Sequence, residues 1–144
     1  MKRPIRSWTL EVGVRIRQKH PLNPKWESLD AMSPNGLPGR SVARPSKWGN
    51  SYMPENYSES ERVKMIEKYW DRIQNMNRDR LYNWFIDPLI GYNLGCYCRL
   101  DEPCHADILL KIVRERVEYL RDQKTNQNQE WIRKNFQPQH GANY

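Results

Sequence analysis

Three cysteines and a histidine lie within ten residues of one another in this 144-residue sequence: Cys96, Cys98, Cys104 and His105. These are all the cysteines that the sequence contains. Thiolate and imidazole are ligands that zinc prefers, and a thiolate beside a histidine is also a nucleophile next to a base. The stretch therefore indicates a functional site, although the residues alone specify no reaction.

In a first interpretation, Cys96, Cys98, Cys104 and His105 together bind zinc through three thiolates and one imidazole. The number and type of the ligands fit a tetrahedral site. The spacing fits less well, because a Cys-x-Cys pair is tighter than the usual pair with two or more intervening residues. Adjacent Cys104 and His105 would also point about 100° apart if both lay in a regular helix.

In a second interpretation, Cys104 and His105 are catalytic. Cys104 follows Pro103 at the start of a helical pattern, where the positive end of the helix dipole lowers the pKa of a thiol. His105 would then supply positive charge or move a proton. In a third interpretation, the cysteines are small apolar residues at a buried strand end, and His105 only caps a helix.

Two enzyme classes are excluded by the spacing around the cysteines. A Cys-x5-Arg phosphatase needs an arginine six residues after its cysteine, and no cysteine here has one. A zinc deaminase needs a second cysteine three residues after Pro-Cys, where this sequence has Asp107.

A second candidate site is a predicted turn that carries Arg44, Lys47, Trp48 and Asn50. The cations could hold a phosphate group while the indole stacks on a base. The alternative is structural: Trp48 fills the core, and the basic side chains are solvated.

The hydrophobic pattern predicts the elements that position these residues. Apolar residues at every second position predict a strand, and a stripe at i, i+3 and i+7 predicts a helix. A short extended segment follows Gly39. The main segments are a strand at 8–17, a helix at 56–76, a short helix at 80–86, a strand at 89–98 and a helix from Pro103.

This order of elements predicts a small α/β domain with helices packed on a mixed or parallel sheet. The cysteine-rich loop would lie at the carboxyl end of a strand, where α/β proteins bind ligands. By length, we expect a single domain at 1–122, interrupted by a proline-rich loop or insertion at 20–39. Residues 123–144 are a polar tail, either mobile or docked by a helical turn with Trp131, Ile132 and Phe136.

Composition limits the environment and the partners. The net charge is +7, the pI is near 9.5 and mean hydropathy is -1.00. A basic surface favours nucleotides, nucleic acid or an acidic host protein as partners. No apolar run is long enough for a membrane span or a signal peptide, so we expect a soluble, cytoplasmic protein with no membrane partner. Three cysteines in such a compartment favour metal or thiol chemistry over disulfides.

Two stretches together resemble a known family. They are Val42-Ala-Arg-Pro-Ser-Lys-Trp-Gly-Asn50, and Leu94-Gly-Cys-Tyr-Cys98 with the downstream Pro103-Cys-His-Ala-Asp-Ile-Leu-Leu110. They are similar to the paired signatures of the domain of unknown function numbered 4326, found in bacteriophage and bacterial proteins. The resemblance covers roughly residues 40 to 115. It departs from the family pattern at Ser51-Tyr52, where Pro-Phe is usual, and at Tyr97, where Trp is usual.

The resemblance implies a small α/β domain with the turn near the Cys–His stretch, and it implies no reaction. We therefore expect one pocket lined by residues of both signatures: Arg44, Trp48, Asn50, Cys98, Cys104 and His105. The leading hypothesis is a phage-type protein of the host cytoplasm that binds, and in its stronger form modifies, a nucleotide or a nucleic-acid base. The alternative is a non-enzymatic, zinc-stabilised module that binds nucleic acid or a host protein.

Overall fold

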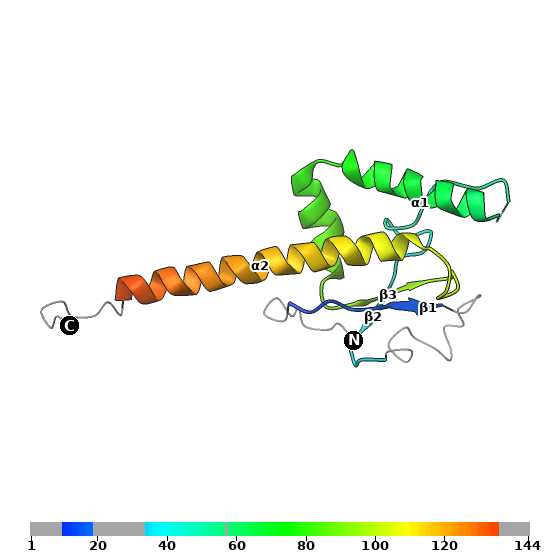
Figure 1. Ribbon diagram of the computed structural model, residues 1–144. Coiled ribbons are helices and arrows are strands. Elements are labelled where there is room, and N and C mark those ends of the chain that lie inside the picture. The colour runs from blue at the N-terminus through cyan, green and yellow to red at the C-terminus, as the bar shows by residue number, and fades with distance from the viewer. Residues whose placement is uncertain (1–9, 19–33, 57, 136–144) are drawn as a thin grey trace, which may run out of the picture.

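A computed structural model describes residues 10–18, 34–56 and 58–135. In chain order the elements are β1 (Arg15–Arg17), β2 (Gly39–Ser41), α1 (Glu59–Gln74), the π-helical η2 (Arg80–Ile86), the 3-10 turn η3 (Asp87–Leu89), β3 (Asn93–Cys96) and α2 (His105–Asn135). Figure 1 shows α2 lying across one face of the strands, with α1 on the far side of α2.

The three strands form one parallel sheet in the order β1-β3-β2. Leu94 of β3 is opposite Arg15 of β1 and Arg40 of β2. All four residues of β3 are buried, as expected for a central strand covered by a helix. The fold class predicted from the sequence is thus confirmed, with the sheet parallel and the cysteine loop at the carboxyl end of β3.

The first strand is shorter than its alternating pattern predicts. Only residues 15–17 form β1, and Val14, expected on the buried face, is 42% exposed. At Gly13 the backbone approaches Tyr92 so closely that a Cβ would lie 2.0 Å from the Tyr92 carbonyl oxygen. This contact and the short partner strand limit the regular pairing. Trp8 lies outside the described residues.

The helix predicted at 56–76 is α1, capped by Ser58, whose side chain accepts a hydrogen bond from the Glu61 amide. Tyr69 and Ile73 are buried as the stripe predicts, whereas Val63 is 47% exposed. The predicted short helix at 80–86 matches η2. The following strand is much shorter than the predicted range of 89–98, because a 3-10 turn containing Pro88 comes first.

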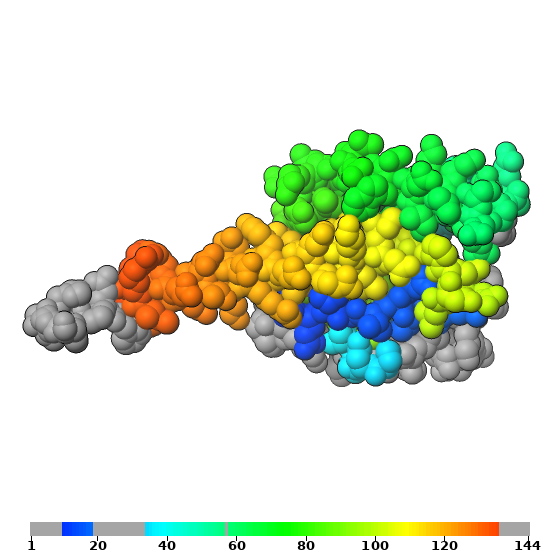
Figure 2. Space-filling model, in the orientation of Figure 1, coloured from blue at the N-terminus to red at the C-terminus, as the bar shows by residue number. Residues whose placement is uncertain are grey.

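Helix α2 continues well beyond its apolar stripe, to Asn135. At 1.5 Å per residue its 31 residues span about 46 Å. Every residue from 121 to 135 is exposed, and Figure 2 shows this end standing away from the body of the molecule. Trp131 and Ile132, candidates for a docking turn, are 56% and 51% exposed. Phe136 and most of the loop at 20–39 lie outside the described residues.

The core lies between α2, the sheet and η2. Its fully buried aromatic and aliphatic side chains come from these three parts, from α1, from η3 and from the residue after β2: Val42, Tyr69, Phe85, Ile86, Leu89, Leu94, Leu109, Val113 and Val117. In the described part of the chain, no helix is both long enough and apolar enough to cross a membrane.

Candidate metal centre

The three cysteines converge at the carboxyl end of β3. Their Sγ atoms all lie within 4.8 Å of one another, and those of Cys96 and Cys104 are 2.9 Å apart. Cys96 and Cys104 are buried, at 1% and 2% exposure, and Cys98 is half-buried. The parallel sheet ends at Cys96, the loop carries Cys98, and Cys104 directly precedes α2. The structure thus brings together the three thiols that the sequence singled out.

Arg15 on the neighbouring strand holds the loop between Cys98 and Cys104. Its guanidinium donates hydrogen bonds to the carbonyl oxygens of Arg99 (2.8 Å) and Glu102 (2.8 Å). It also forms an ion pair with Asp107 at 2.9 Å, and only 7% of the Arg15 side chain is exposed. Asp107 in turn accepts a hydrogen bond from the Cys104 amide at 3.2 Å, which caps the first turn of α2. Arg15 was not among the predicted site residues, because no motif in the neighbouring sequence distinguishes it from a solvated basic residue.

The three thiols affect one another's ionisation. Hydrogen bonds from Cys104 and Cys96 lower the pKa of Cys98, and the nearby charge of Arg15 lowers it further. Hydrogen bonds with Cys96 and Cys98, together with burial, raise the pKa of Cys104. The cluster therefore favours a thiolate at Cys98 that accepts hydrogen bonds from its two neighbours. Cys104, the predicted nucleophile, is the thiol that favours its proton.

His105 is buried beside this cluster. Its Nε2 lies 2.7 Å from the carbonyl oxygen of Val42, and its Nδ1 lies 3.7 Å from Cys104 Sγ. Burial lowers the pKa of His105, which favours the neutral ring. The ring of Tyr69 packs on it at a centroid distance of 4.9 Å. His105 therefore contacts Cys104, but it is not among the residues whose ligand atoms all lie within 4.8 Å.

The turn of the first signature is built into the core. Trp48 is 6% exposed, and its Nε1 donates to the Phe85 carbonyl at 2.6 Å. Asn50 is 8% exposed and donates to the Met65 carbonyl at 2.9 Å. A Cβ at Gly49 would lie 2.7–2.9 Å from Arg44 atoms, so the tight turn requires glycine. The indole has no free face for a nucleobase, because it is buried; the structure favours the structural alternative for Trp48.

Comparisons with known proteins agree with the signatures. The family model described as a domain of unknown function, DUF4326, matches residues 31–115, more than half of the chain. The chain belongs to this family. Both signature stretches lie within the matched residues.

The chain is also similar to an uncharacterised 12.4 kDa protein of Enterobacteria phage T4, encoded in the nrdA-td intergenic region. It is 30% identical over 73 residues, which are 51% of this chain and 65% of the relative. The match thus spans less than two thirds of the relative's length. No solved structure matches this chain. Neither the family description nor the description of the phage protein names an activity.

The two DUF4326 signatures meet through buried contacts. His105 contacts Val42, while Tyr69, packed on His105, donates its hydroxyl hydrogen to the Trp48 carbonyl at 2.6 Å. A hollow of about 380 Å³ lies elsewhere, between α1 and α2. Its lining residues belong to neither predicted site: Ile66, Glu67, Trp70, Asp71, Ile108 and Lys111. The expected proximity of the signatures is present, but four of the six expected pocket residues are buried: Trp48, Asn50, Cys104 and His105.

The first signature carries two cations, Arg44 and Lys47. Arg44 is exposed, whereas Lys47 contacts Trp84. The Lys47 ammonium donates to the Trp84 carbonyl at 2.7 Å and lies 4.5 Å from the centroid of the Trp84 ring. Two more cations from other elements lie in this region, Arg40 on β2 and Arg80 on η2. Sequence analysis missed both, because the segments that carry them are separated along the chain.

Proposed function

We propose that this protein is a zinc-stabilised module that binds nucleic acid, and that it is not a thiol enzyme. The observation that carries the proposal is the convergence of three cysteine sulfurs at the carboxyl end of β3, two of them almost completely buried. Zinc bound there would tie the strand, the loop and the start of α2 together, as structural zinc sites do.

The sulfur geometry suits zinc. With Zn–S bonds of about 2.3 Å at the tetrahedral angle, two thiolates lie about 3.8 Å apart. The Sγ atoms here range from 2.9 Å apart to within 4.8 Å, so small side-chain rotations bring all three to that spacing. Cys96, Cys98 and Cys104 are the proposed sulfur ligands.

His105 is the proposed fourth ligand. The Val42 carbonyl oxygen can only accept a hydrogen bond, so Nε2 carries the hydrogen and Nδ1 keeps a free lone pair in the neutral ring. Zinc-bound histidines usually donate their other N–H to such a carbonyl. Nδ1 faces Cys104 Sγ at 3.7 Å, close to the spacing of about 3.6 Å between a nitrogen and a sulfur on one tetrahedral zinc. Four protein ligands make a closed site with no position for substrate.

Burial argues against catalysis by these side chains. Cys104 is 2% exposed and His105 is 9% exposed, so a substrate would have no route to either. Burial and hydrogen bonding also raise the pKa of Cys104, which disfavours the nucleophilic thiolate. The positive net charge, +7, supports nucleic acid as the partner, because each phosphate contact releases bound counterions.

Metal analysis of protein purified under reducing conditions tests the zinc centre. We expect one zinc per chain, lost in Cys96→Ser and Cys104→Ser. Leu100→Ser is the matched control, since Leu100 is on the same loop and 61% exposed. A metal-free wild type that binds no added zinc would refute the centre, and rapid alkylation of Cys104 would then favour the enzyme.

A salt titration tests the nucleic-acid partner. Affinity for a labelled DNA or RNA strand should fall steeply between about 50 and 200 mM salt. Absence of binding at the lowest salt would refute this partner and leave the zinc centre untouched.

A further inference from the structure

Three cations from three different segments lie over a group of aromatic rings, Trp48, Trp84 and Tyr92, of which Trp84 on η2 is exposed. The guanidinium of Arg80 lies 4.1 Å from the centroid of the Trp84 ring, and the Lys47 ammonium lies 4.5 Å from it. Lys47 is also 4.8 Å from the centroid of the Trp48 ring, and Arg40 is 5.6 Å from that ring. Arg40 lies in addition 4.2 Å from the centroid of the Tyr92 ring. Aromatic rings thus hold all three cations; we name Arg40, Lys47 and Arg80 the cation cluster.

Within the described part of the chain, the cation cluster has no acidic partner. Every ion pair within 4.0 Å there uses other basic side chains: Arg15, Arg62, Lys64, Arg99, Arg116 and Arg133. The Nε atom of Arg40 is buried and makes no hydrogen bond to any described residue. Burial lowers the pKa of Lys47, and the positive charges of Arg40 and Arg80 lower it further, as repulsion between like charges does. Ring contacts offset this repulsion only in part, since each is worth about 0.5–1 kcal/mol at an exposed site.

A bound anion would remove the repulsion. Guanidinium groups bind phosphate oxygens in bidentate fashion, and an ammonium adds a point charge. Arg80 is exposed, and the central carbon of its planar guanidinium lies 4.1 Å from the centroid of the Trp84 ring. Unpaired bases stack on such arginine planes in single-stranded complexes. This arrangement fits a phosphate backbone with unpaired bases better than a duplex.

We propose that the cation cluster is where a single nucleic-acid strand binds, with its phosphates on Arg40, Lys47 and Arg80 and one base stacked on the Arg80–Trp84 pair. The assignment rests on the proposed function and names the surface and the form of nucleic acid. It does not depend on the zinc centre.

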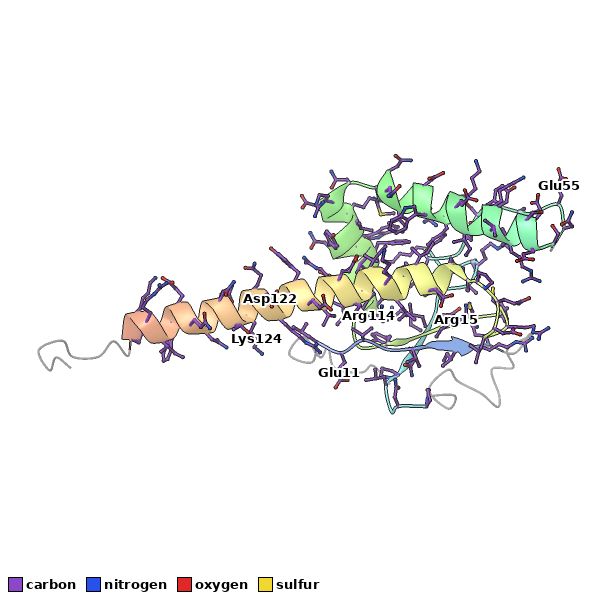
Figure 3. The ribbon with its side chains drawn as sticks, viewed as in Figure 1. Glu11, Arg15, Glu55, Arg114, Asp122 and Lys124 are labelled. Carbon is purple, nitrogen blue, oxygen red and sulfur yellow. The ribbon has the colours of Figure 1, made fainter. Side chains whose placement is uncertain are left out.

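Fluorescence anisotropy with a labelled oligothymidylate strand and a matched duplex tests the assignment. The variant is Arg40→Gln combined with Arg80→Gln. The control is Lys124→Gln combined with Lys134→Gln, which removes the same charge from the exposed end of α2, where Figure 3 labels Lys124. Zinc content and the circular dichroism spectrum verify that each variant is folded.

We expect the Arg40/Arg80 variant to bind the strand about 10-fold or more weakly. The slope of log affinity against log salt should fall by about 1.4, because each lost phosphate contact contributes about 0.7 for a single strand. The Lys124/Lys134 control should change the affinity and the salt slope much less. The wild type should bind the single strand more tightly than the duplex.

Equal losses in variant and control would overturn the assignment while the proposed function stands, since binding would then follow net charge alone. A wild-type preference for the duplex would overturn it in the same way. No wild-type binding at low salt would overturn the assignment together with the nucleic-acid partner.

Discussion

The Nε2 atom of His105 lies 2.7 Å from the carbonyl oxygen of Val42, and this contact joins the two signature stretches of the DUF4326 family. It fixes the ring so that Nδ1 faces Cys104 at 3.7 Å. One buried side chain thereby links the turn before α1 to the cysteine cluster. The contact joins residues 63 positions apart in the sequence and explains why the two motifs belong to a single structural unit.

His105→Ala should weaken zinc binding by at least about 100-fold, because it removes the proposed fourth ligand and not merely a partner of that ligand. Competition with a chromophoric zinc chelator measures the affinity. Unchanged affinity would assign His105 a purely structural role and leave a centre of three thiolates alone.

Tyr69→Phe is a matched test of the residue that packs on the His105 ring. It keeps the ring that packs on His105 and every proposed ligand, but it removes the hydroxyl that donates to the Trp48 carbonyl at 2.6 Å. We expect unfolding by urea to require about 1–2 kcal/mol less free energy, because a buried carbonyl loses its partner. Zinc affinity should be unaltered; a large loss would mean that the two signatures act on the metal together.

Arg15→Ala should loosen the loop that carries Cys98. The substitution removes the donor to two loop carbonyls and the partner of Asp107. We expect a loss of about 3 kcal/mol in unfolding free energy, because hydrogen bonds to charged groups are worth about 1.5–3 kcal/mol each and Asp107 is partly solvated. Urea unfolding of zinc-loaded protein measures it. Arg17→Ala, on the same strand and exposed, is the control, and equal effects would contradict the role of Arg15.

In metal-free protein, Cys98 should be alkylated before Cys96 and Cys104. Cys98 is half-buried, whereas the other two are almost completely covered. Because hydrogen bonds from the other thiols lower its pKa, the thiolate persists as pH falls, and its rate should fall less between about pH 8 and about pH 6 than that of a free cysteine. Peptide mass spectrometry after timed alkylation gives the order. Faster labelling of Cys104 would contradict the geometry and revive the catalytic interpretation.

The sequence pattern was sufficient where the signal is local. The stripe of α1 and its Ser58 cap are local features, and the grouping of the three thiols follows from their spacing. Helix α2 is longer than its apolar stripe, because the polar sequence that follows the stripe contains no helix-ending residue. Residues 123–135 contain no glycine or proline, so nothing ends the helix there even though no core covers it.

The rest depended on tertiary placement. A tryptophan at position 48 can stack on a base or fill the core, and its burial, at 6% exposure, becomes visible only in the folded chain. Arg15 lies in a basic strand face that looks like an ordinary solvated surface. The cation cluster combines residues from β2, a turn and η2. The pattern within any one of these segments cannot predict that they come together in the fold.

The central position of β3 sets an order of events during synthesis. Neither β1 nor β2 can form its sheet hydrogen bonds until residues 93–96 have left the ribosome, because each pairs with β3 and not with the other. The nascent N-terminal half must therefore remain without its sheet until β3, which ends at the first cysteine, Cys96, has been made. The sulfur cluster can close only after Cys104 follows, and the core is completed later still, because α2 supplies Leu109, Val113 and Val117.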